Sequence, residues 1–263
     1  MSTGQVVDTE VAREFMALAL EKVERAALGD IAAELVDKSA RFRALLTPAR
    51  LPGLQSSELR RLLRAVFATR RQADALLDRV GPAELQAQIG ALLYGEAELA
   101  ERFQAFVDAL SGYWGDVRLS RDDQARGHAD LPEAMLCDLA AELLHFTRPD
   151  DRWLWTRWMW DPRAGTGALP LVVEELYDLH GRTAGETYLK VGVAVAFVRA
   201  TGEAAGFARF GPGPFGVDVF LACVYAVYMY TTLRLRMTQE FNRVVPQLPE
   251  LARRLLGVWR LEL

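Results

Sequence analysis

The stretch from Arg148 to Arg163 holds the residue types best suited to binding chemistry. It reads RPDDRWLWTRWMWDPR, and four of the six tryptophans of the chain lie in it within eight consecutive positions. Trp and Arg are the side chains most enriched at binding hot spots, and Arg can grip a carboxylate or phosphate through two parallel hydrogen bonds. The sequence predicts that this stretch, the Trp/Arg segment, forms a binding surface. Its candidate binding residues are Arg148, Arg152, Trp153, Trp155, Arg157, Trp158, Trp160 and Arg163.

Two interpretations of the Trp/Arg segment remain open at this point. As a short helix over 153–160, it places Trp155 and Trp158 on one face and Trp153 and Trp160 on another. Tryptophans on two faces are difficult to bury from one side only, which favours an open groove, a ligand pocket or a partner surface. Alternatively, these tryptophans pack in the core and each arginine pairs with a neighbouring aspartate, because large aromatic side chains dominate cores as well as interfaces.

Motifs for catalysis and metal binding are incomplete. Glu142 and His145 form a single Glu-x-x-His, whereas a di-iron helix bundle needs two such pairs with further carboxylates. Three histidines and two separated cysteines, Cys137 and Cys223, do not have the spacing of a zinc site. The glycine-rich stretch over 161–167 lacks the Gly-Lys-Ser/Thr of a P-loop. We expect no metal, no cofactor and no catalytic residue. The first alternative is an enzyme with a pocket near Glu142, His145 and the Trp/Arg segment.

A second alternative function is association with nucleic acid. The turn Leu51-Pro-Gly-Leu54 resembles the hairpin of helix-hairpin-helix DNA-binding proteins, in which a second glycine stands where this chain has Gln55. That resemblance implies backbone N–H groups that meet phosphate. The predicted third helix, which follows the turn, is rich in arginine, with Arg60, Arg61, Arg64, Arg70 and Arg71. The net charge of −4 argues against this alternative, because it gives no bulk attraction to a polyanion.

The elements that must position these residues are predicted to be helical throughout. Apolar side chains recur at three- and four-residue spacing, and no strict alternation lasts long enough for a sheet. We therefore expect an all-α fold, an orthogonal bundle of about ten helices. The β-branched run Leu189–Val198 is assigned to a helix because of its length and flanks. The expected helices cover approximately residues 8–28, 31–46, 56–80, 82–94, 96–110, 132–146, 153–160, 170–180, 184–200, 218–237 and 249–256.

Composition divides the chain and suggests its compartment. Aromatic residues concentrate in the second half, so we expect an amphipathic helical subdomain over 1–112, a loop over 113–130 and a subdomain with a larger apolar core over 131–263. The longest apolar run, Val219–Leu233, is about 15 residues, whereas a bilayer span needs roughly 20. We expect no membrane span, no secretory signal and a cytoplasmic location.

Together these patterns predict a non-catalytic intracellular helical binding protein, an accessory, assembly or regulatory factor. Its expected partner is a protein or a small anionic ligand, recognised through the Trp/Arg segment. Nucleic acid is not the expected partner, and the sequence leaves open whether the protein forms a homo-oligomer.

Overall fold

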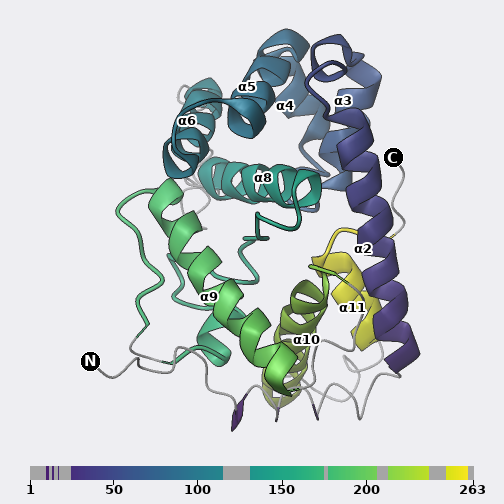
Figure 1. Cartoon of the computed structure of the whole chain (residues 1–263), viewed down its shortest axis with the longest axis vertical. Coiled ribbons are helices and arrows are strands. Elements are labelled where there is room, and N and C mark those ends of the chain that lie inside the picture. Colours follow the sequence, from purple (N-terminus) through teal and green to yellow (C-terminus); the bar gives the residue numbers. More distant parts are fainter. Residues whose placement is uncertain are drawn as a thin grey trace. The chain divides into compact units, whose positions relative to one another are not determined.

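All regular secondary structure in the described part of the chain is helical, apart from isolated β-bridge residues: Asp161 pairs with Thr166, and Val173 is a further bridge residue (Figure 1). The structure, a computed structural model, describes residues 10, 11, 14, 17, 25–114, 131–174, 177–205, 213–236 and 247–259. The all-α prediction is confirmed. The described α-helices are α2 (Arg25–Leu45), α3 (Ser56–Ala65), α4 (Ala73–Val80), α5 (Pro82–Tyr94), α6 (Leu99–Ser111), α8 (Leu131–Thr147), α9 (Ala184–Ala205), α10 (Gly216–Arg236) and α11 (Leu248–Leu255). Short 3-10 turns are η1 (Leu51–Gly53), η2 (Gly112–Trp114) and η4 (Leu169–Leu171).

The chain forms two compact units that alternate along the sequence. Unit 1 comprises Met1–Lys38, Arg157–Leu179 and Lys190–Leu261, and unit 2 comprises Ser39–Thr156, His180–Leu189 and Glu262–Leu263. Within the Trp/Arg segment, the chain leaves unit 2 and enters unit 1 between Thr156 and Arg157. The predicted loop over 113–130 lies almost entirely outside the described residues, so the proposed subdomain boundary stays a prediction.

In unit 2, helix α8 packs against both α5 and α6 (Figure 1). The apolar residues of α6 recur at helical spacing, and Phe103, Phe106 and Leu110 are fully buried. Nearly every side chain of α8 from Met135 onwards is buried, as expected for a helix covered on several sides. This helix ends at Thr147, directly before the Trp/Arg segment, so its position determines where the segment begins.

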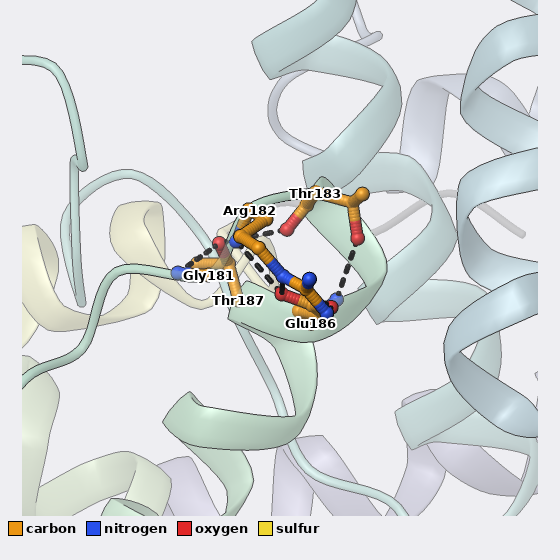
Figure 2. A network of polar contacts seen from close by, with 5 residues as sticks. All are labelled: Gly181, Arg182, Thr183, Glu186 and Thr187. Carbon is orange, nitrogen blue, oxygen red and sulfur yellow. Dashed lines mark hydrogen bonds and ion pairs between the residues drawn. The ribbon is translucent and has the colours of Figure 1, made fainter.

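The start of α9 is held by a network of side-chain caps (Figure 2). Thr183 Oγ1 accepts a hydrogen bond from the Glu186 N–H at 3.1 Å, and the Glu186 carboxylate accepts one from the Arg182 N–H at 2.8 Å. These bonds satisfy N–H groups that a helix leaves unpaired at its first turn. A Cβ atom on Gly185 would lie 2.0 Å from the Ala100 carbonyl oxygen, so only glycine permits the close approach of α9 to α6.

In unit 1, helices α10 and α11 pack against each other. The side chains from Val217 to Val224 in α10 are buried, which fits the predicted core helix. At the other side of α11, the Arg253 guanidinium pairs with Glu34 of α2 at 2.8 Å, and the buried Lys38 ammonium donates to the Leu256 carbonyl at 3.2 Å. None of the described helices is long and apolar enough to cross a membrane.

Two helix boundaries predicted from sequence are wrong. Helix α2 continues through Gly29 and Asp30, where a break was expected. The single helix expected over 56–80 is two helices, α3 and α4, separated by a turn. In that turn the Thr69 hydroxyl donates to the Leu63 carbonyl at 2.6 Å, a side-chain bond that offers the backbone an alternative to the helix.

Two predicted helices are also wrong. Residues 153–160 are extended and turn-like, and the described part of 170–180 contains no α-helix but the end of η4, a turn and a β-bridge residue at Val173. The Ala168 and Leu169 N–H groups donate to the Trp158 and Met159 carbonyls, so backbone groups of the segment pair with a distant stretch rather than with a helical turn. Tertiary packing of large aromatic side chains overrides the weak local helical pattern here.

Candidate functional site

The first two tryptophans of the Trp/Arg segment belong to the core of unit 2. Trp153 stacks on Tyr188 with ring centroids 4.8 Å apart, and its Nε1–H donates to the Tyr188 carbonyl at 2.7 Å. The Tyr188 hydroxyl in turn donates to the Trp153 carbonyl at 3.1 Å. Trp155 is 5% exposed and stacks on Phe103 at 5.8 Å. These reciprocal contacts fix the path of the chain as it leaves α8.

The other two tryptophans of the segment are buried in unit 1. Trp158 is 7% exposed and its Nε1–H donates to the Leu255 carbonyl at 3.0 Å, while Trp160 is 5% exposed. The Trp158 ring lies 6.2 Å from that of Tyr225 in α10. Such burial is what the core interpretation of the tryptophans requires, and it leaves little aromatic surface for a partner.

The arginines of the segment lie closer to solvent than its tryptophans. Arg148 is 46% exposed in its side chain and pairs with Asp151 at 2.5 Å. Arg152 is 16% exposed and pairs with the same carboxylate at 3.1 Å. Arg157 is half-buried and Arg163 is exposed. The predicted pairing of arginines with neighbouring aspartates is therefore found at Asp151, where one carboxylate serves two guanidinium groups.

A third arginine, Arg102 of α6, joins this site, although no local pattern singles it out. Its Nη1 donates to the Leu92 carbonyl at 2.8 Å, and it pairs with no carboxylate among the described residues. Burial lowers the pKa of Arg102 most, and the positive charges of Arg152 and Arg148 lower it further, opposed by Glu98. Arg102, Arg148 and Arg152, the arginine cluster, therefore lie near enough to repel one another.

Two hydrogen-bond donors of the arginine cluster are buried and unused. The Nε atoms of Arg102 and Arg152 have no hydrogen-bond partner in the part of the chain that the structure describes. An unsatisfied buried donor costs about 1–3 kcal/mol, and more when it is charged. An anion that accepted hydrogen bonds from these groups would recover that cost and reduce the repulsion between the arginines.

His145 of α8 positions the cluster rather than acting in it. Its Nδ1 lies 3.0 Å from the Arg152 carbonyl oxygen, and since a carbonyl only accepts, Nδ1 carries the proton. The His145 ring is fully buried and meets Phe146 edge-on at 5.1 Å, and Glu142 is buried too. Among the described residues, no group of three or more His, Cys, Asp or Glu side chains could hold a metal ion.

The arginines after the 51–54 turn are engaged differently. Arg60 and Arg64 both pair with Asp74, at 2.5 and 2.8 Å. N–H groups in and directly after the turn are already hydrogen-bonded. The Gly53 N–H donates to the Arg50 carbonyl, and the Gln55 N–H donates to the Glu58 carboxylate. These two backbone donors are thus occupied within the turn, and nucleic-acid association stays an alternative prediction from the sequence.

Two other sequence features are structural. In the glycine-rich stretch, Asp161 Oδ1 accepts hydrogen bonds from the Arg163 and Ala164 N–H groups, which closes a turn and leaves those donors unavailable to a phosphate. Both cysteines are buried and free. Burial raises the pKa of Cys223 to about 12 and raises that of Cys137 as well, so neither thiol is activated as a nucleophile.

Comparisons with known proteins give no relative for this chain. No family model matches it, and neither a curated protein nor a solved structure matches it. The arginine cluster therefore has to be interpreted from its own geometry and charge.

Proposed function

We propose that this protein is a non-catalytic helical binding protein, an accessory or regulatory factor, that takes up a small carboxylate ligand at the arginine cluster. The observation that carries the proposal is the pair of buried Nε donors on Arg102 and Arg152, both without a hydrogen-bond partner among the described residues. Native proteins pair nearly all buried polar groups, and an unpaired one calls for a ligand, an ion or a role.

Charge favours a monoanionic carboxylate as the ligand. The three guanidinium groups face the carboxylates of Asp151 and Glu98, which leaves a formal excess of one positive charge. A guanidinium presents its N–H groups as a planar fork that matches the two oxygens of a carboxylate. The 46% exposure of the Arg148 side chain gives such a ligand a route from solvent to the more buried Arg152.

The burial of the tryptophans directs the proposal toward a small ligand. A protein partner recognised through Trp hot spots needs those rings at the surface, whereas Trp155, Trp158 and Trp160 are 5–7% exposed. The cluster also supports binding better than catalysis. Its one neighbouring histidine, His145, is fully buried and donates to the Arg152 carbonyl, so that nitrogen is not a free base.

The proposal is tested by titrating the full chain with acetate and following backbone amide shifts by NMR. We expect saturable shifts around residues 102 and 148–152, and an affinity at least about tenfold weaker in Arg152→Gln, since a charge-assisted hydrogen bond is worth about 1.5–3 kcal/mol. Arg64→Gln is the matched control, because that arginine is paired with Asp74 outside the cluster.

Thermal melts of both variants show whether each one folds. Retained folding with selective loss of acetate binding in Arg152→Gln supports the proposal. Equal weakening in Arg64→Gln, or an absence of saturable binding by the wild-type protein, overturns it. Should Arg152→Gln fail to fold, Arg148→Gln replaces it, because its exposed side chain leaves the core intact.

A further inference from the structure

The end of α5 carries a partly exposed aromatic side chain. Tyr94, the last residue of this helix, is 40% exposed. Its hydroxyl donates to the carbonyl of Leu46, the residue that follows α2, and this hydrogen bond ties the end of α5 to the end of α2. The ring is thus held at its hydroxyl end, which lowers the ordering cost for any group that packs on it.

Arg102 of the arginine cluster lies against the same end of α5. Its Nη1 donates to the Leu92 carbonyl at 2.8 Å. A Cβ atom added to Gly95, the residue after Tyr94, would lie 3.1 Å from Arg102 Cδ, so the stem of the arginine passes close to the backbone at this point. The Arg102 side chain and Tyr94 therefore meet the same last turn of α5.

A second set of contacts brings Arg148 toward Tyr94. The rings of Phe42 in α2 and Phe146 in α8 lie 5.4 Å apart, so α2 packs on the end of α8 directly before Arg148. Leu46, which accepts the Tyr94 hydroxyl, follows Phe42 by one helical turn. Burial raises the pKa of the Tyr94 phenol, and the positive charge of Arg148 opposes that rise, which agrees with this proximity.

We propose that the ligand of the arginine cluster is an aromatic carboxylate, whose carboxylate group binds the arginines while its ring packs on Tyr94. This inference rests on the proposed function and adds the residue that selects the organic group of the ligand. Guanidinium groups bind any carboxylate, whereas an aromatic ring pairs with another ring in a preferred offset-stacked or edge-on geometry. An aromatic monocarboxylate also keeps the single negative charge that balances the cluster.

The test compares benzoate with cyclohexanecarboxylate in titrations of the full chain. Both have one negative charge at pH 7 and a six-membered ring, but only benzoate is aromatic. We expect benzoate to bind about two- to tenfold more tightly, because an aromatic pair contributes about 0.5–1.5 kcal/mol beyond its buried area. Nuclear Overhauser effects between the ring protons of benzoate and those of Tyr94 should locate the ligand.

Two tyrosine variants assign the preference for benzoate to one side chain. Tyr94→Leu should lower the affinity for benzoate to that for cyclohexanecarboxylate, whereas Tyr94→Phe, which retains the ring, should keep benzoate the tighter ligand. Tyr113→Leu is the matched control, because Tyr113 is 41% exposed and lies in η2, at the opposite end of α6 from Arg102. Thermal melts show whether each variant folds. Should Tyr94→Leu unfold, the affinity ratio and the Overhauser effects of the wild type decide.

The outcomes separate this inference from the proposed function. It is overturned if benzoate binds no more tightly than cyclohexanecarboxylate, if folded Tyr94→Leu keeps the preference, or if Tyr113→Leu loses it equally. Arg152→Gln, which tests the proposed function, should weaken acetate and benzoate alike. Saturable, Arg152-dependent acetate binding without a preference for benzoate overturns the aromatic ligand alone. Absence of binding by all three carboxylates overturns the proposed function and this inference with it.

Discussion

Arginines are frequent both in α3 with its following turn and in the Trp/Arg segment, yet the two regions use them in different ways. In α3, Arg60 and Arg64 lie at the surface and share Asp74. In the segment, Arg152 is mostly buried, shares Asp151 with Arg148 and keeps an unused Nε donor. The number of arginines therefore does not identify an anion site. An anion site is distinguished instead by guanidinium donors that neighbouring carboxylates leave unpaired.

The tryptophans explain why one arginine of the segment, Arg152, is mostly buried. The rings of Trp153 and Trp155 stack on Tyr188 and Phe103 and hold this part of the backbone in unit 2, where Arg152 lies near Arg102. Helix α3 has no comparable aromatic anchor and presents its arginines to water, where ion pairs are screened. Arg61 of α3 differs from its neighbours Arg60 and Arg64 in that it does not share Asp74.

Removal of an aromatic anchor of the segment should have the largest effect on stability. Trp155→Ala should lower the free energy of unfolding by about 3–5 kcal/mol, because the substitution deletes a nearly fully buried side chain and leaves a cavity. Phe67→Ala, in the exposed turn after α3, should cost much less. Urea denaturation of both variants measures the difference. A stable Trp155→Ala protein would mean that the segment does not depend on its aromatic core.

Alkaline pH should destabilise the protein through buried groups outside α3, namely Tyr188 of α9, which stacks on Trp153, and Cys223 of α10. Burial raises the pKa of Tyr188, and it raises the pKa of Cys223 to about 12, so both groups stay protonated when folded. Unfolded Tyr and Cys ionise near pH 10 and 8.5, so stability should fall as pH rises above about 8.5, by up to about 1.4 kcal/mol per pH unit for each group.

The variant Tyr188→Phe isolates the contribution of the Tyr188 phenol to this pH dependence. Its hydroxyl donates to the Trp153 carbonyl, so the variant should be less stable at neutral pH by about 1 kcal/mol. Above pH 10 its stability should decline less steeply than that of the wild type. Chemical denaturation at a series of pH values measures both slopes. If the unfolding free energies of the variant and the wild type fall equally steeply with pH, ionisation of the Tyr188 phenol does not contribute to the pH dependence.

The smallest expected effect belongs to the paired arginines of α3. Asp74 is exposed, and hydrogen bonds from Arg64 and then Arg60 lower its pKa, so the pair stabilises the fold above the ordinary pKa of an aspartate and loses that contribution in acid. Asp74→Asn should barely move the denaturation midpoint, and the difference should vanish at high salt, which screens surface pairs. A large, salt-independent loss would place Asp74 among the structural residues.

Helix positions were predictable where apolar spacing and stop signals coincide. Pro82 at the first position of α5 and the buried 103, 106 and 110 positions of α6 gave nearly correct ranges. The segment at 153–160 was mistaken for a helix, because its tryptophans pair with groups far away in the chain, such as Tyr188. Local periodicity does not report such distant partners.

Only part of the candidate site was predictable from the sequence. Arg148 and Arg152 were singled out by their neighbours, whereas Arg102 lies in an ordinary amphipathic helix and carries no local signal. Arg41 of α2 and Arg61 of α3 likewise line one cavity, which no pattern within either helix predicts.

By itself, the sequence determined the helical class, most helix ranges and the place where tryptophan and arginine concentrate. These properties depend on residues within one or two helical turns of each other, which a periodic pattern records. The tertiary structure alone decided that the tryptophans are buried, that Asp74 occupies Arg60 and Arg64, and that Arg102 joins Arg148 and Arg152. Burial and charge pairing are set by contacts between residues distant in the chain, and these decide which arginines remain available to a ligand.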